Sequence, residues 1–492
     1  LPGSDVDGSS SDGADWTLTF EILDPGTYGT ATVVSANVFT YSVPLMADTM
    51  DTFTYRVRDP SNEVSNISTV TVVVASPRPY VDITNTDEVV LESITAITIG
   101  GTNNEWVTGA MWWTNNPTGD YGTFEAASSW SVPDIALACG RNTITVFGTN
   151  FAGIATSDSV TIMRPQTHYV WTNSPSPTSP YTNWTTAAHT IQDAVDVALS
   201  NDTVLVTNGV YDAGGAVTPS GVLTSRVCIT RALTLQSVNG PASSFIVGAA
   251  DPATTSNGPA AVRCLYLVTN VVVSGFTLTN GYTSTSGDAD FDRSGGGVFV
   301  FRSGTLTNCV ITGNSAHYCG GGVYGWYGGR LDRCVVSGNR RLYGGGAYCY
   351  TYYANDPFNN CLFVHNTAKI YGGGVYVHDC YPCLNNCTIA DNIAWSGGGI
   401  YGVGGRVRNC IAYYNLPEGS DVSSSSSYVD YTCCLGYSGE GNITEAPQFV
   451  DRDAGDYRLR SGSPCVNAGT NGYVTYDTDL DGYPRIVDGT VD

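Results

Sequence analysis

Charge is scarce in this sequence, and most of it is negative. Charged residues make up 13% of the 492 residues, lysine occurs once, at Lys369, and the formal net charge is −23. A protein that binds nucleic acid needs a basic surface against the phosphates, and docking on anionic lipid needs the same. The composition therefore argues against both partners, and it is compatible with cation binding and high solubility.

Long apolar runs are also missing. No stretch of the sequence approaches the roughly 18 consecutive apolar residues of a membrane-spanning helix. The sequence begins at Leu1, with neither an initiator methionine nor a signal peptide before it, so we expect a mature form or a segment of something longer. We expect no membrane span in this segment.

What the sequence does contain is glycine, 57 residues, and tyrosine, 31 residues, with many Ser, Thr and Asn. These residues favour strands and turns, so the composition predicts an all-β protein. Cysteine occurs 15 times, an odd number that does not by itself indicate disulfides or their absence.

Residues 1–76 contain short alternating segments separated by Pro, Gly, Asp and Asn, which predict a β-sandwich. GSDVDG (3–8), GTATV, FTYSVP and DTFTYRVRD in this stretch resemble the cadherin-like tandem domains of large bacterial surface proteins. In that family a further strand precedes the DVDG segment, and its absence here predicts an open sheet edge. Asp5 and Asp7 are weak candidates for a calcium ligand pair.

Residues 81–163 predict a second sandwich, with strand patterns such as NTITVFGTN (142–150). Trp112, Trp113 and Trp130 can form its core, and a platform for a ligand is the alternative. The region resembles the small Ig-like modules beside β-helices in bacterial exported proteins. Together with the first sandwich it makes two Ig-like β-sandwich domains.

Residues 164–182 are rich in Pro, Ser and Thr and predict an extended linker. HTIQDAVDVALS (189–200) has one apolar stripe and predicts a short helix. We expect this helix to cap the open end of a β-solenoid that spans residues 183–492, because the first turn of the solenoid would otherwise expose its core.

A repeat of about 25 residues dominates the C-terminal half and predicts a three-sided parallel β-helix, one turn per repeat. Each repeat has a glycine triplet, then a cysteine, with an apolar residue three before and two after the cysteine and an asparagine five after it. The triplets begin at Gly295, Gly320, Gly344, Gly372 and Gly397; the cysteines are Cys309, Cys334, Cys361, Cys387 and Cys410; the asparagines are Asn314, Asn339, Asn366, Asn392 and Asn415. In-register turns stack identical side chains, so we expect a buried cysteine ladder, an asparagine ladder and glycine turns.

The segments 441–470 and 477–492 closely resemble the C-terminal turns of bacterial right-handed parallel β-helix repeat proteins, which are secreted or surface-bound. With IQDAVDVA and DTVLVTNGVYD, the resemblance covers residues 185–492. It implies an extracellular or cell-surface location, and a protein of the type that is anchored through its C-terminus. Relatives usually continue with a further short strand, so both ends of this sequence are expected to lie inside a domain.

Parallel β-helices include pectate-lyase-like and polygalacturonase-like enzymes as well as adhesins and fibres, so the fold alone does not choose a function. The repeats have few carboxylates, and the paired acids that a glycosidase needs are not evident. The weak catalytic candidates are the acids Asp288, Asp290 and Asp292 and the bases Arg330, Arg340 and Arg341, with Arg333 and His317 nearby.

An aromatic residue follows each glycine triplet. The residue just before each aromatic residue is aliphatic, and we call these five residues the Val set: Val298, Val323, Ala347, Val375 and Ile400. If the Val set faces the core, the aromatic side chains form an exposed stripe, which either stabilises the ladder or contacts a glycan or another protein. The stripe consists of Phe299, Tyr324, Tyr348, Tyr376 and Tyr401. A separate loop, DTDLDG, spaces Asp477, Asp479 and Asp481 as calcium loops do, although a plain turn fits equally well.

These observations favour a structural or adhesive protein of the cell surface, in which one copy adds a strand to the open edge of the next and builds a homopolymer. Surface glycans and other surface proteins are the other expected partners. The alternative is a carbohydrate-active enzyme, a polysaccharide lyase or glycosidase.

Overall fold

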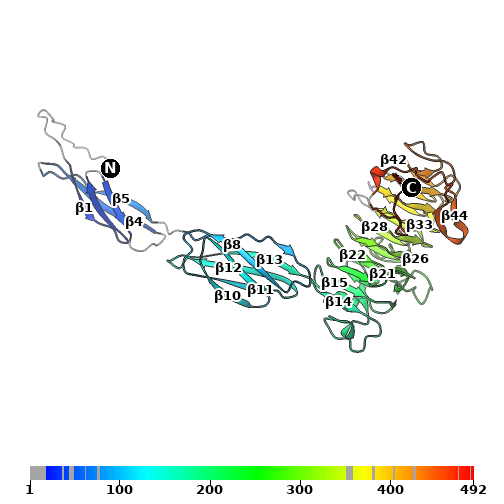
Figure 1. The fold of residues 1–492 in the computed structure, drawn as a ribbon, viewed down its shortest axis with the longest axis horizontal. Coiled ribbons are helices and arrows are strands. Elements are labelled where there is room, and N and C mark those ends of the chain that lie inside the picture. Colours follow the sequence, from blue (N-terminus) through cyan, green and yellow to red (C-terminus); the bar gives the residue numbers. More distant parts are fainter. Residues whose placement is uncertain are drawn as a thin grey trace. The chain divides into compact units, whose positions relative to one another are not determined.

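A computed structural model describes residues 18–35, 38–43, 49–60, 62–74, 78–350, 358–378, 383–402, 405–424, 428–474, 476–487 and 489–491. The chain forms two compact units, residues 1–164 and 165–492, which are drawn in Figure 1. Asp5 and Asp7 lie outside the described residues. Among the described helices, none is long and apolar enough to cross a membrane.

The first unit contains two sets of packed sheets. In the first set, the pair β2–β3 shares an aromatic core, around Phe20 and Phe53, with the sheet β1–β4–β5. These strands are β1 (Thr19–Asp24), β2 (Thr30–Ser35), β3 (Val38–Ser42), β4 (Thr49–Arg58) and β5 (Ser68–Val74).

In the second set, the sheets β10–β9–β12–β13–β7 and β11–β8–β6 enclose one core, so this region is a sandwich. Trp130 is buried in that core, and the half-buried Trp112 stacks on Phe147 at 5.2 Å. The strands are β6 (Val81–Ile83), β7 (Glu88–Val89), β8 (Ala96–Asn103), β9 (Ala110–Asn116), β10 (Asp120–Glu125), β11 (Ser129–Ala136), β12 (Gly140–Thr149) and β13 (Ala155–Arg164).

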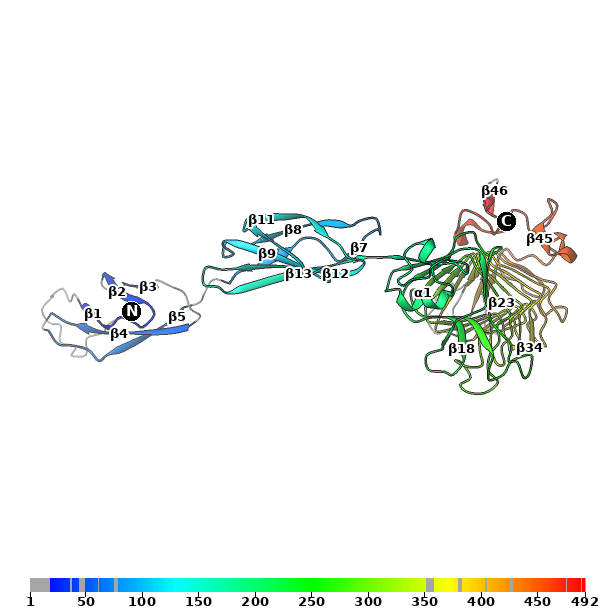
Figure 2. The ribbon, with the colours of Figure 1, turned by 90° about the horizontal axis from the view of Figure 1, so that it is seen from below.

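The second unit confirms the predicted three-sided parallel β-helix, whose turns stack one behind another (Figure 2). Its first sheet contains β14 (Thr167–Val170), β15 (Thr203–Val206), β19 (Thr234–Ser237), β22 (Val272–Ser274), β25 (Thr305–Thr307), β28 (Arg330–Asp332), β32 (Phe358–Asn359), β36 (Cys383–Asn385), β39 (Arg406–Arg408) and β42 (Tyr428–Asp430). The second sheet contains β16 (Gly209–Tyr211), β20 (Ser244–Val247), β23 (Thr277–Thr279), β26 (Val310–Thr312), β29 (Val335–Ser337), β33 (Leu362–Val364), β37 (Thr388–Ala390), β40 (Ile411–Tyr413) and β43 (Cys433–Cys434). The third sheet contains β17 (Ala216–Val217), β18 (Thr224–Ile229), β21 (Val262–Leu267), β24 (Val298–Phe301), β27 (Val323–Trp326), β31 (Ala347–Tyr350), β35 (Val375–His378), β38 (Ile400–Gly402) and β41 (Val422–Ser424).

The expected linker at 164–182 is wrong for part of its length, because it contains β14, which pairs in parallel with β15. The buried His168 of β14 bonds through Nε2 to Asp202 Oδ2 at 3.0 Å. The Pro- and Ser-rich residues that follow obscured this strand in the sequence. The β-helix therefore begins at β14, before the helix α1 (Ile191–Val197).

The helix α1 is shorter than the predicted 189–200, but its apolar stripe packs as expected. Thr190 caps its N-terminus by accepting a hydrogen bond from the backbone N–H of Asp193 at 3.2 Å. Ile191, Ala194 and Val195 are buried in the core of the β-helix.

The repeat residues take the positions that the sequence predicts. The five ladder cysteines are at most 2% exposed, and the five asparagines at most 1%. Each asparagine Oδ1 from Asn339 to Asn415 accepts hydrogen bonds from the backbone N–H and the side-chain amide of the asparagine one turn earlier, at 2.9–3.0 Å. The first glycine of every triplet has φ between +60° and +68°, a backbone conformation that favours glycine.

Six further short strands of the second unit lie outside the three sheets. β30 (Arg340–Tyr343) and β34 (Thr367–Tyr371) pair at the turn before the third sheet, and β44–β45 and β46–β47 belong to the C-terminal segment. Their bounds are β44 (Phe449–Asp451), β45 (Asp456–Leu459), β46 (Ile486–Val487) and β47 (Thr490–Val491).

Candidate functional site

The outer face of the third sheet presents two parallel columns of aromatic side chains. Successive side chains of a strand point to opposite faces of the sheet, so the Val set faces the core and the aromatic residues face outward. Because the strands are in register, the outward side chains of neighbouring turns stack on one another. Successive rings of the first column are 4.8–5.5 Å apart between centroids. The first column is Tyr266, Phe299, Tyr324, Tyr348, Tyr376 and Tyr401, and the second is Phe301, Trp326, Tyr350 and His378.

The first column is not the exposed stripe that the sequence predicts. Phe299 is fully buried, Tyr324 is 3% exposed and Tyr376 is 9% exposed, whereas Tyr348 and Tyr401 are half-buried. The loop between β23 and β24 folds over the first turns and stacks Phe291 on Phe299 at 5.4 Å. Further along the column, Tyr343 and Tyr371 contact the Tyr376 ring at 6.2 Å. The second column keeps more exposure, with Trp326 and Tyr350 half-buried.

The three predicted acids all belong to this covering loop, but their hydrogen-bond partners differ. Asp292 is 3% exposed, and its carboxylate accepts hydrogen bonds from the backbone N–H groups of Val222 and Leu223 at 2.6 and 3.0 Å and from that of Asp288 at 2.9 Å. Asp288 Oδ1 in turn accepts from the N–H groups of Asp290 and Phe291. Two of the acids therefore build the loop.

Asp290 is the acid that faces the aromatic columns. Its Oδ1 accepts a 2.5 Å hydrogen bond from the Tyr324 hydroxyl. Burial, reinforced by the charge of Asp290, raises the pKa of Tyr324, so this tyrosine stays a hydrogen-bond donor.

A hollow of about 290 Å³ opens between Asp290 and the two columns. Its walls are one carboxylate, one thiol and otherwise aromatic rings. They are Asp290, Tyr318, Cys319, Tyr324, Trp326, Tyr327, Tyr348 and Tyr350. Such a wall offers flat apolar faces with hydroxyl and carboxylate groups at their edges.

The predicted arginine group is divided between two sides of the β-helix. Arg330 lies on β28 of the first sheet, where Nε donates to Asp332 Oδ2 at 2.5 Å and Nη2 to the Tyr476 hydroxyl at 2.8 Å. Arg333 lies 5.4 Å over the Tyr476 ring. These two arginines therefore hold the C-terminal segment, on a different side of the β-helix from the aromatic columns of the third sheet.

The other two arginines lie on β30, near the hollow. Arg340 is exposed, and Arg341 donates from Nη1 to the backbone carbonyls of Ala316 and His317 at 3.0 and 3.3 Å. Burial lowers the pKa of Arg341 to about 10. Burial also lowers the pKa of His317, and Arg293 and Arg341 add to that effect.

The predicted calcium loop closes as a hairpin turn. Asp479 Oδ1 accepts hydrogen bonds from the backbone N–H groups of Asp481 and Tyr483 at 3.0 and 2.8 Å. No group of three or more His, Cys, Asp or Glu in the described part of the chain is arranged to hold a metal ion. Calcium binding by Asp477, Asp479 and Asp481 stays a prediction.

Two features of the site were missed by sequence reasoning. The second aromatic column could have been found, because it follows the first by two positions on each strand. Arg263, which holds the covering loop from beneath, carries no pattern that would reveal it. Its guanidinium is fully buried and donates to the carbonyls of Phe291, Ser294 and Gly295 and to Thr218 Oγ1 at 2.6–3.0 Å.

No protein-family model and no curated protein matches this sequence. Solved structures that resemble it distantly include a pectate lyase and an exopolygalacturonase. Pectate lyase Pel9A is 13% identical, with 65% of this chain and 96% of that chain covered and a TM-score of 0.42. A Yersinia enterocolitica family 28 exopolygalacturonase is 11% identical, with 72% and 86% covered and a TM-score of 0.15.

Proposed function

We propose that the hollow on the third sheet binds a carbohydrate, and that the protein is an extracellular or cell-surface structural or adhesive protein. The observation that supports this most is the wall of Trp326, Tyr348 and Tyr350 with the Asp290 carboxylate at its edge. Aromatic faces pack against the C–H faces of sugar rings, and a carboxylate accepts hydrogen bonds from their hydroxyls. The fixed spacing of the β-helix holds these groups rigidly.

Binding to a glycan array tests this proposal. Trp326→Ala and Tyr350→Ala remove rings from the hollow and are expected to reduce binding at least tenfold. Tyr428→Ala is the matched control, because Tyr428 is 67% exposed and lies on the first sheet. Equal binding by all three variants and the wild type, or no binding by the wild type, would reject the carbohydrate site.

Polysaccharide cleavage is the second candidate, because carboxylate and guanidinium groups lie on the same side of the β-helix. Asp290 and Arg341 both act electrostatically on the Cys319 thiol, so each lies within electrostatic range of that thiol. Incubation with a panel of neutral and uronic polysaccharides, followed by measurement of reducing ends and of unsaturated products, tests this function. Product formation that Asp290→Asn abolishes would establish an enzyme in place of an adhesin.

Homopolymer formation is a further part of the proposal. β41 and β42 are the last strands of their sheets in the described chain, and such strands are templates for an incoming strand. The last strand of the second sheet, β43, is already bridged in parallel by Ile443. Light scattering at increasing protein concentration tests assembly. A constant monomeric mass would remove the fibre while leaving the carbohydrate site untouched.

A further inference from the structure

The C-terminal segment, residues 449–491, folds back along the outside of the β-helix and encloses a groove. Asn409 holds the segment by donating from Nδ2 to the Thr470 carbonyl at 2.8 Å and accepting at Oδ1 from the Thr470 N–H at 2.9 Å. Asn386 Nδ2 donates to the Tyr473 carbonyl at 3.1 Å. The segment is thereby anchored on the turn between the first and second sheets.

The groove between this segment and the β-helix has a volume of about 860 Å³. Its floor is formed by three consecutive turns, at Asn360, Asn386 and Asn409. One wall is the strand β45 region and the other is the 479–485 hairpin. Ligand pockets in proteins are typically about 300–1,000 Å³, so the groove is large enough for a small ligand.

One side chain of the floor has no partner. Asn360 is 2% exposed, and neither its Oδ1 nor its Nδ2 makes a hydrogen bond. The equivalent amides of the next two turns are satisfied, because Asn409 Nδ2 donates to Asn386 Oδ1 at 3.2 Å and both bond the C-terminal segment. A buried amide with both ends unpaired is costly and uncommon in folded proteins.

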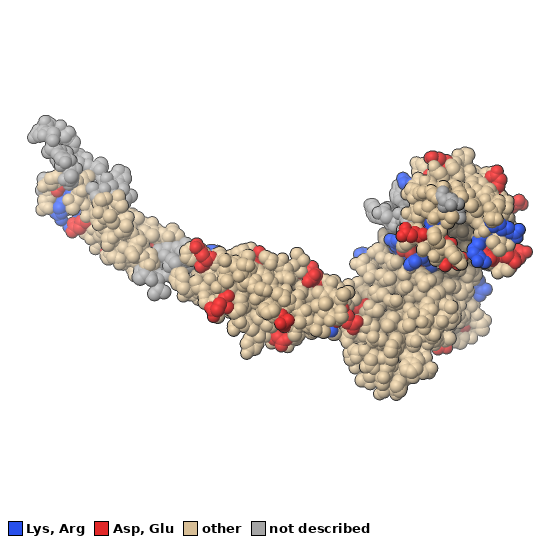
Figure 3. Space-filling view, in the orientation of Figure 1, with Lys and Arg blue, Asp and Glu red and all other residues tan. Residues whose placement is uncertain are grey.

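The charges around the groove largely neutralise one another. Figure 3 shows side chains of both signs gathered toward the C-terminal part of the β-helix. The lining has three arginines and three aspartates, Arg458, Arg460, Arg485, Asp456, Asp479 and Asp481. Arg458 pairs with Asp456, Nε donating at 2.8 Å, and Arg460 Nη2 donates to the Val450 carbonyl at 2.8 Å. The groove therefore has no net charge that would attract a charged ligand.

We propose that this groove is a second ligand site, separate from the aromatic hollow, and that it binds a neutral mono- or disaccharide through Asn360. The free amide offers one acceptor and two donor hydrogens, which match the hydroxyl pairs of a sugar ring. The exposed ring of Tyr483 at the rim supplies an apolar face for the same ligand.

Saturation-transfer NMR with a panel of neutral monosaccharides and disaccharides tests the proposal on the full chain. Asn360→Gly removes the amide and is compatible with the left-handed backbone there, where φ is +51°. Asn308→Gly is the matched control, because Asn308 occupies the same turn position at φ +49° and is exposed outside the groove. We expect at least one sugar to bind the wild type and Asn308→Gly equally, and Asn360→Gly at least tenfold more weakly.

Asn360→Asp, which keeps the side-chain shape but loses the donor hydrogens, is expected to weaken binding to a similar extent. Trp326→Ala should leave this binding unchanged, which separates the groove from the aromatic hollow. If no sugar of the panel binds, or if Asn360→Gly binds as tightly as the wild type with an unchanged melting temperature, the groove holds water only and the proposal is wrong.

Discussion

The guanidinium carbon of Arg263 lies 5.2 Å from the centroid of the Phe299 ring, directly beneath the loop that covers the first aromatic column. The arginine is fully buried, and three of its four hydrogen bonds end on the backbone of that loop. It therefore fixes both the ring and the loop that together place Asp290 at the edge of the hollow.

Arg263→Met is expected to lower the free energy of unfolding of the β-helix by about 3 kcal/mol or more, because several buried carbonyls lose their donors at about 1–3 kcal/mol each. Chemical denaturation measures this loss. Arg302→Met is the control, since Arg302 lies 5.3 Å over Phe301 but is exposed, and it should cost less than about 1 kcal/mol. Equal losses in the two variants would contradict the role given to Arg263.

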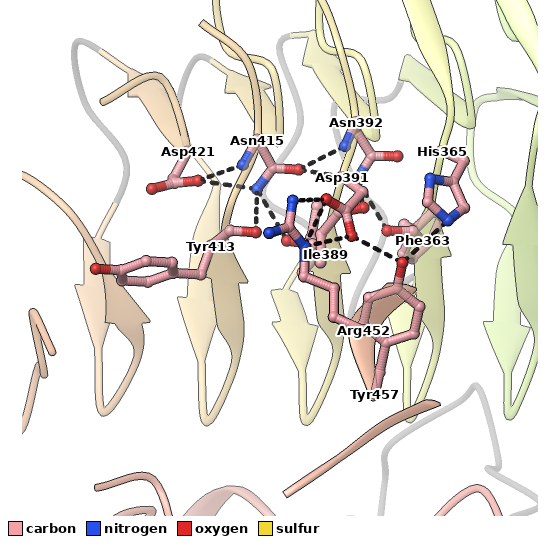
Figure 4. A network of polar contacts seen from close by, with 11 residues as sticks. Phe363, His365, Ile389, Asp391, Asn392, Tyr413, Asn415, Asp421, Arg452 and Tyr457 are labelled. Atoms are coloured by element: carbon pink, nitrogen blue, oxygen red, sulfur yellow. Dashed lines mark hydrogen bonds and ion pairs between the residues drawn. The ribbon is translucent and has the colours of Figure 1, made fainter. Parts of the chain in front are cut away.

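The asparagine ladder ends on an acid, and this makes a prediction about pH. Asp421 Oδ1 accepts from the N–H and from the side-chain amide of Asn415, both at 3.0 Å (Figure 4). Burial raises the pKa of Asp421 in the folded protein above its unfolded value of about 3.9. At pH values between the unfolded and the folded pKa of Asp421, the folded state therefore binds more protons than the unfolded state. The contribution of this group to stability falls as pH rises through that range.

Asp421→Asn should remove that part of the slope and make the β-helix less sensitive to pH between about pH 4 and neutrality. Melting temperatures across this range measure the effect, with the exposed Asp453→Asn as the control. A variant that keeps the full wild-type slope would show that Asp421 does not titrate with folding.

The buried cysteine ladder predicts a pattern of thiol reactivity. Cys361 is 2% exposed, its thiol donates to the carbonyls of Asn359 and Leu331, and burial raises its pKa. A maleimide or disulfide reagent should label Cys139, which is partly exposed, well before any ladder thiol. Mass spectrometry of the labelled peptides measures the order, and rapid labelling of the ladder in native protein would contradict the core assignment.

The C-terminal segment is held at a further point by Asp391. Arg452 donates to this carboxylate from Nε at 2.9 and 3.0 Å and from Nη2, and the Tyr457 hydroxyl donates at 2.8 Å while also contacting His365 Nε2 at 3.1 Å (Figure 4). Arg452→Ala should therefore speed amide exchange in β44 and β45 and leave the turns of the β-helix unchanged. If the substitution lowers the free energy of local opening of this segment by about 1.4 kcal/mol, amide exchange there becomes about tenfold faster.

Arg458→Ala provides the comparison for Arg452→Ala, because Arg458 pairs within the segment, with Asp456, and not with the β-helix. It is expected to leave exchange in β44 unchanged. Faster exchange throughout the β-helix in Arg452→Ala would instead indicate a global effect.

Calcium binding by the DTDLDG loop is testable by thermal melting. Calcium at millimolar concentration is expected to raise the melting temperature by mass action if the loop binds it. Asp481→Asn is the sharper variant, since the Asp479 carboxylate already accepts two backbone N–H groups that close the turn. We expect the rise in the wild type and its loss in Asp481→Asn; an unchanged wild-type melt would assign the loop to a plain turn.

The sequence alone determined the features that repeat. In-register stacking places the same position of every turn in the same surroundings, so Cys361 predicts the burial of Cys387, and Asn366 predicts the bonds of Asn392. The first glycine of each triplet follows for the same reason. A residue pattern that recurs in five turns can be recognised even where one turn is irregular.

Only the tertiary structure decided the features that occur once. The burial of Tyr324 depends on a loop whose Phe291 returns over the sheet, and the separation of Arg330 from Arg341 depends on which sheet each strand joins. The orphaned amide of Asn360 depends on where the C-terminal segment leaves the turn ladder. These contacts join residues far apart in sequence through irregular loops, and no local periodicity encodes such a meeting.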